Sequence, residues 1–210
     1  MTIANIVVER DRALIGVDTL AAYMPQGHGI VPESERRDRQ TTKVWLYPHA
    51  NMAMTGRGDV SLMAYVRLFL DHAAVRDFDH AVELMSSALP TAFQMAMTQR
   101  KQGTGLDVFP GVDLVLVGWS RVMCFKGRRW LRRPEDTDFQ ASNIDTWLAL
   151  PEVDRVERVL VPTTDRGMED LARKQMAWAN ENYPGTCGGR LMVYELTPEA
   201  ISVRTVADLA

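Results

Sequence analysis

The sequence predicts an α+β fold in which two antiparallel sheets lie between layers of helices. Short apolar runs typical of strands open the chain, and two long segments with helical spacing follow them. Strand-like runs then return on either side of one further helical segment. Strands that are grouped along the chain, rather than alternating with helices, favour antiparallel pairing over βαβ units.

The predicted strands are short runs rich in apolar and β-branched residues, bounded by charged residues or glycine. In the N-terminal part they cover 3–9, 12–18, 43–47 and 51–56. In the C-terminal part they cover 112–119, 121–125 with an extension at 130–131, 190–196 and 200–206. Residues 134–164 show no regular pattern.

Three segments carry apolar residues three or four positions apart, which predicts helices. The first begins after Asp59, whose side chain can cap a helix N-terminus. The second spans about 78–101 and the third about 165–181. The methionines of the second helix are predicted to belong to the core rather than to a cofactor site.

Length and composition favour one globular domain spanning residues 1–210. The hydrophobic fraction is 46% and the net charge is −3, which argues against a nucleic-acid surface. The arginines at 128–133 therefore predict a solvated strand edge rather than a polyanion site. No apolar stretch reaches the roughly 18–20 residues that a membrane helix needs. Charged residues at 9–12 interrupt the first apolar run, so no signal peptide is expected.

The chain contains two cysteines and four histidines. Two cysteines do not make a disulfide framework, which fits a reducing cytoplasm. The histidines lack metal-ligand spacing and neither cysteine has a nearby partner, so we expect no metal and no cofactor. The long connection 22–42 is interpreted equally well as a functional loop or as a solvated loop at a subunit contact.

Thr2 is the residue with the most chemical consequence. If Met1 is removed, Thr2 carries a hydroxyl nucleophile and a free amine that can serve as its general base. Asp18 ends the second predicted strand, Lys43 opens the third, and Gly56 ends the fourth. Cys187 is a poor candidate nucleophile, because it has no histidine nearby in the sequence to lower its pKa.

These residues resemble a known pattern. The chain looks like a proteasome-type N-terminal nucleophile (Ntn) hydrolase, similar to proteasome β-subunits and to the bacterial proteasome-related peptidases. The matching residues are Thr2, Val17-Asp18-Thr19, Lys43-Val44, Met54-Thr55-Gly56, Gly118-Trp119-Ser120 and Cys187-Gly188-Gly189. The sequence departs from the pattern at Leu20, where the family has arginine, and at Pro184, where an acid is expected. Only Ser142 stands near the position of the family's supporting serine.

The resemblance implies a four-layer αββα sandwich and a threonine peptidase with Thr2, Asp18, Lys43 and Gly56 as its catalytic residues. An α-amine with a pKa of about 7.7–8.0 can act as a base near neutral pH. Lys43 would lower the pKa of that amine and of the hydroxyl, and Asp18 would orient Lys43. The backbone N–H of Gly56 would stabilise the oxyanion.

The resemblance also implies assembly into a ring or helical stack of identical subunits, with polypeptides or peptides as substrates. Whether an ATP-dependent unfoldase supplies them is left open, and no nucleic-acid or membrane partner is expected. Two alternatives have the same fold. One is a catalytically inactive assembly protein, and the other is an Ntn amidohydrolase acting on a small amide.

Overall fold

The computed structural model describes residues 2–20, 40–105, 107–152 and 160–209. The chain divides into two compact units, Met1–Val44 with Thr146–Ala210 and Trp45–Asp145, and each unit is described by itself. Most of the 22–42 connection lies outside the described residues, as does Met1. The two interpretations of that connection therefore stay predictions.

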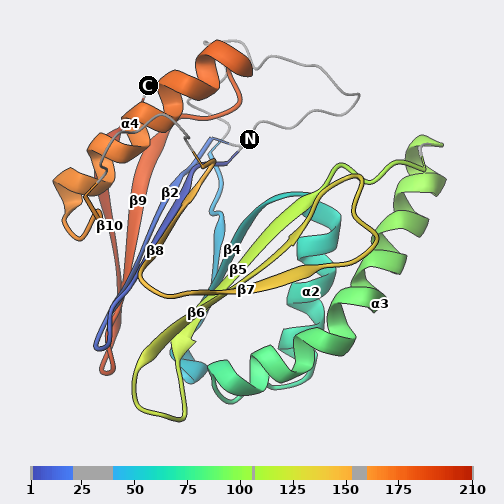
Figure 1. Ribbon diagram of the computed structural model, residues 1–210, viewed down its shortest axis with the longest axis horizontal. Helices are drawn as coiled ribbons and strands as arrows, with labels where there is room; N and C mark the ends of the chain where they lie inside the picture. Colours follow the sequence, from blue (N-terminus) through green and yellow to red (C-terminus); the bar gives the residue numbers. More distant parts are fainter. Residues whose placement is uncertain (1, 21–39, 106, 153–159, 210) are drawn as a thin grey trace. The chain divides into compact units, whose positions relative to one another are not determined.

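The first unit contains a five-stranded antiparallel sheet in the order β10-β9-β2-β1-β8 (Figure 1). The strands are β1 Ala4–Val8, β2 Ala13–Asp18, β8 Trp147–Leu150, β9 Arg190–Leu196 and β10 Ile201–Asp208. Helix α4, Asp165–Asn182, lies across one face of this sheet. Its buried Met168 and Ala172 pack with Ile3, Val7 and Leu14 in an apolar layer.

The second unit contains a five-stranded sheet in the order β3-β4-β5-β6-β7. The strands are β3 Val44–Tyr47, β4 Met52–Gly58, β5 Val112–Trp119, β6 Phe125–Arg132 and β7 Gln140–Ile144. A short 3-10 turn, η1 Pro48–Ala50, connects β3 to β4. Helices α2 Val60–His72 and α3 Phe78–Thr104 cover one face of the sheet (Figure 1).

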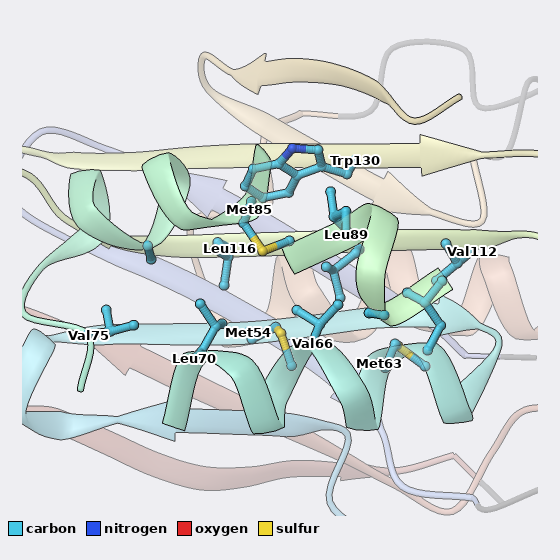
Figure 2. Close-up of a cluster of buried hydrophobic side chains, with 14 of the residues drawn as sticks. Met54, Met63, Val66, Leu70, Val75, Met85, Leu89, Val112, Leu116 and Trp130 are labelled. Atoms are coloured by element: carbon cyan, nitrogen blue, oxygen red, sulfur yellow. The ribbon is translucent and has the colours of Figure 1, made fainter. Parts of the chain in front are cut away.

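The core of the second unit lies between these helices and the sheet. Figure 2 shows Val66 of α2 beside Met54, Met85 of α3 beside Leu116, and Met63 of α2 near Val112. Trp130 of β6 closes one side of the cluster. Met85 of α3 is therefore a core residue and Met97 packs against the core, as their helical spacing predicts, whereas Met95 is exposed.

The α+β class and the two antiparallel sheets agree with the sequence prediction. The boundaries are less accurate. Residues 121–124 form a turn instead of the predicted strand. The strand that follows, β6, begins at Phe125 and continues to Arg132. The irregular region contains β7 and β8, which the pattern did not predict. β7 is a mostly exposed strand of polar residues, so it shows no apolar alternation. Among the described residues, no helix is long and apolar enough to cross a membrane.

Asp59 caps α2 as its position in the sequence predicts. Its side chain accepts a hydrogen bond of 2.8 Å from the backbone N–H of Leu62, and the residue is 7% exposed. Replacing an N-cap aspartate by alanine costs about 1 kcal/mol, since it leaves helix N–H groups without an acceptor. We therefore expect Asp59→Ala to lower the urea midpoint, while Asp59→Ser keeps most of the stability.

The matched control for this change is Asp71→Ala in the same helix. Asp71 pairs with Arg67 at 3.4 Å, but both side chains are about half exposed. Such surface pairs contribute about 0–1 kcal/mol, so the midpoint of Asp71→Ala should stay near the wild-type value. Equal losses for Asp59→Ala and Asp71→Ala would contradict a specific capping role.

Candidate functional site

The candidate site is built around the carboxylate of Asp18 at the end of β2. Asp18 is fully buried and accepts three hydrogen bonds. Its Oδ1 accepts from the backbone N–H of Ile3 at 2.8 Å and from Nζ of Lys43 at 2.8 Å. Its Oδ2 accepts from the backbone N–H of Gly188 at 3.1 Å. Segments far apart in the sequence therefore meet at one carboxylate.

The contact between Asp18 and Lys43 is a buried ion pair. The Lys43 side chain is 10% exposed and that of Asp18 is 0% exposed. Taking two charges out of water is costly, and their mutual attraction offsets that cost only when the geometry is good. Removing one partner of such a pair leaves an uncompensated buried charge and destabilises a protein by about 3–5 kcal/mol. The two residues are therefore tightly coupled, whatever chemistry they serve.

Thr2 is held next to this pair through the backbone. The N–H that Asp18 binds belongs to the peptide bond joining Thr2 to Ile3. The backbone N–H of Asp18 returns a hydrogen bond of 3.4 Å to the carbonyl of Ile3. Thr2 itself is partly exposed and precedes the first residue of β1. Asp18 thus fixes the start of β1 while Thr2 stays accessible.

The turn at Gly188 and Gly189 supports the carboxylate from the other side. The carbonyl of Gly188 accepts from the N–H of Leu20 at 3.0 Å, and that of Gly189 accepts from the N–H of Leu209 at 2.7 Å. Gly189 has φ +79°, and a Cβ there would lie 2.7 Å from Oγ1 of Thr19. Backbone of this kind favours glycine, so both the conformation and the space exclude a side chain.

Cys187 lies beside the same charges, which the sequence did not make evident. Its thiol is buried, and desolvation raises its pKa to about 11, with the negative charge of Asp18 adding to the increase. The charge of Lys43 acts in the opposite direction. Because a thiolate is the nucleophilic form, a thiol with so high a pKa is inert at neutral pH. This geometry supports the view that Cys187 is not the nucleophile.

Gly56 and Ser142 belong to the second unit. Gly56 lies in β4 opposite Leu114 of β5, where a Cβ would come within 2.5 Å of the carbonyl oxygen of Asp113. Close approach of two strands is therefore one reason for glycine at this position. Ser142 is exposed on β7. The predicted role of Gly56 as an oxyanion donor stays a prediction.

Within the part of the chain that the structure describes, no group of three or more histidine, cysteine, aspartate or glutamate side chains could hold a metal ion.

Comparison with solved structures shows a likeness of fold. A Gly-1 mutant of Anbu from Hyphomicrobium sp. strain MC1 superposes with a TM-score of 0.59 at 13% identity, covering 99% of this chain and 87% of that one. Anbu (ancestral beta-subunit) from Yersinia bercovieri gives a TM-score of 0.57 at 12% identity, covering 97% and 87%. Sequence comparison gives no such match, either to a family model or to a curated protein.

These findings correct the family assignment made from the motifs. The assignment to the proteasome-type N-terminal nucleophile hydrolases is wrong, because no family model matches and the likeness to Anbu lies in the fold alone. The described residues form two antiparallel sheets and three α-helices, and this architecture does not itself identify a nucleophile. Motifs of two or three residues carry too little information to establish a family, since one fold hosts many functions.

The turn at Gly189 gives a test of the site's geometry. We expect Gly189→Ala to lower the free energy of unfolding by about 1–3 kcal/mol, because alanine is strained at positive φ and its Cβ meets Thr19. Urea unfolding of the purified variant measures this. Gly103→Ala is the matched control, since a Cβ at Gly103 in α3 meets nothing within 4 Å. There alanine should raise stability by about 0.5–1 kcal/mol.

The thiol of Cys187 predicts a pH dependence of stability. Its pKa is raised from 9.0 to about 11, so the folded state keeps a proton that the unfolded state loses above about pH 9. The stabilising contribution is therefore fully present below pH 9 and is lost as the pH rises toward 11. Urea unfolding between pH 8 and pH 11 should show a steeper decline for wild type than for Cys187→Ala. Identical slopes would contradict the burial of this thiol.

Proposed function

We propose that this protein hydrolyses amide bonds of peptides, with Thr2 as an N-terminal nucleophile after removal of Met1. One observation carries the proposal. The carboxylate that binds Lys43 also binds the peptide N–H directly after Thr2, so a buried ion pair anchors the segment that would bear the nucleophile. Threonine with a free amine contains both the hydroxyl and the base that amide cleavage requires.

The proposed reaction proceeds through an acyl enzyme. The α-amine of Thr2 accepts the hydroxyl proton as the oxygen attacks the carbonyl carbon of the scissile amide. The tetrahedral intermediate then collapses, the amine of Thr2 returns the proton to the leaving nitrogen, and an ester on Thr2 remains. Water hydrolyses that ester with the same amine as base. In this reaction the ammonium group of Lys43 places a positive charge near the reacting groups, and Asp18 orients Lys43.

Besides this ion pair, the proposed enzyme needs an oxyanion donor, an assembly of subunits and a supply of substrate. The four-layer αββα sandwich and stabilisation of the oxyanion by the N–H of Gly56 are part of the proposal. Self-assembly is also part of the proposal, and the description of one Anbu neighbour as an ancestral beta-subunit supports it. The proposed setting is a reducing cytoplasm, where Cys124 and Cys187 stay as free thiols. An ATP-dependent unfoldase is the kind of partner that would supply unfolded polypeptide.

The test uses an electrophile selective for an N-terminal threonine, such as an epoxyketone, on protein whose N-terminal mass shows that Met1 is absent. We expect a cyclic adduct that joins the hydroxyl and amine of Thr2, mapped by mass spectrometry. Thr2→Ala should fold normally and form no adduct. Lys43→Ala should react at least about tenfold more slowly, because the positive charge beside Thr2 is lost.

Lys101→Ala is the matched control, because Lys101 is an exposed lysine of the second unit whose contact with Asp107 is at the surface. Its reaction rate should equal that of wild type. A verified Met1-free sample that forms no adduct would reject the proposal and favour a non-catalytic assembly protein. An adduct together with turnover of only small amides would instead favour an amidohydrolase.

A further inference from the structure

A buried polar pair interrupts the apolar layer between α4 and the first sheet. Ile3, Asn5 and Val7 alternate along the start of the chain, and Ile3 and Val7 pack in that layer with Met168 and Ala179 of α4. Asn5 and Gln175 are both 0% exposed. The Nδ2 of Asn5 donates to Oε1 of Gln175 at 2.7 Å, across 170 positions of sequence.

The pair extends to the end of β8. Nε2 of Gln175 donates to the carbonyl oxygen of Pro151 at 3.0 Å, and Pro151 directly follows β8. β1 pairs with both β8 and β2, so its own backbone is already bound on both sides. The two amide side chains therefore add one constraint that the sheet lacks. They link Asn5 of β1 to α4, and α4 to the residue after β8.

Stability does not account for this pair. Oδ1 of Asn5 is buried and has no hydrogen-bond partner among the described residues. Leaving an acceptor unsatisfied costs free energy, whereas two apolar side chains of similar shape can replace a buried polar pair at little or no cost. In other proteins a single buried polar contact of this kind fixes the register of packed elements.

Hydrophobic burial alone does not determine the register of β1 along α4. A shift of β1 by two residues would return the same side of the strand to α4, because side chains alternate with a period of two. With an apolar residue at position 5, such a shifted strand would still bury apolar side chains. With Asn5 it would separate two buried amides, so only one position along α4 keeps the hydrogen bond between Asn5 and Gln175.

We propose that Asn5 and Gln175 are positioning residues, which fix β1 along α4 and thereby set the place of Thr2 relative to Asp18 and Lys43. Asn5 lies in β1, three residues after Thr2, and the Asp18 contact to Ile3 lies between them. This inference rests on the proposed function, since the position of Thr2 matters for catalysis only if Thr2 reacts. The pair itself touches no reacting atom.

The test compares two double variants with wild type. Asn5→Leu with Gln175→Leu removes the polar link and keeps an apolar layer, while Asn5→Gln with Gln175→Asn exchanges the amides and conserves their combined length. We expect the apolar variant to have a melting temperature at least equal to that of wild type and to react with the epoxyketone at least tenfold more slowly. The exchanged variant should react within threefold of wild type. Gln99→Leu, at an exposed glutamine of α3, should leave the rate unchanged.

A wild-type rate in the stably folded apolar variant would overturn the inference and assign the pair a merely structural role. If the apolar variant does not fold, the single changes Asn5→Gln and Gln175→Asn replace it. Each single change should then lower the reaction rate at least tenfold, with recovery in the exchanged variant. Single changes that keep the wild-type rate would overturn the inference.

Hydrogen exchange separates failure of this inference from failure of the proposed function. If wild-type Thr2 does not react at all, the proposed function is rejected and the positioning role is decided by the amides of residues 3–8. The hydrogen-exchange rates of these amides should be at least tenfold higher in the apolar variant than in the variant with the two amides exchanged. The rates of the β9 and β10 amides should be equal in both variants. Equal exchange of residues 3–8 would overturn the inference on its own evidence.

Discussion

The buried carboxylate of Asp18 is the interaction on which the organisation of the first unit depends. Its donors come from Ile3, Lys43 and Gly188, so the start of β1, the segment before β3 and the turn before β9 converge on one side chain. A carboxylate without exposure to water must find donors within the protein, because its ionised form is costly to bury alone. This requirement is directional, unlike hydrophobic burial, and it therefore fixes where these segments meet.

Buried apolar groups and buried polar groups contribute differently to this fold. Apolar layers under α4 and under α2 and α3 bury most of the large side chains and supply the driving force for folding. The buried polar groups select one arrangement among those that would bury the same area. Asp18 with Lys43 and Asn5 with Gln175 do so in the first unit. Asp113 does so in the second, where Arg129 binds it with two hydrogen bonds of 2.8 Å.

The comparisons separate fold from family. Two Anbu chains share the fold at 12–13% identity, although no family model matches the sequence. A fold requires hydrophobic pattern and volume in the right places, which many sequences satisfy, whereas chemistry requires particular groups at particular distances. Asp18 and Lys43 are such groups, because their charged atoms lie 2.8 Å apart.

The sequence by itself determined the α+β class, most strands and helices, and the cap at Asp59, since periodicity and capping are local properties of the chain. Its motifs also directed attention to Thr2, Asp18 and Lys43, but they did not establish a family. Only the tertiary structure decided which residues meet. β7 forms from polar residues because β6 offers it a partner, and Cys187 has a raised pKa because folding buries it near Asp18. The Asn5–Gln175 bond joins positions 170 residues apart, and contacts at such separation leave no local pattern from which they could be predicted.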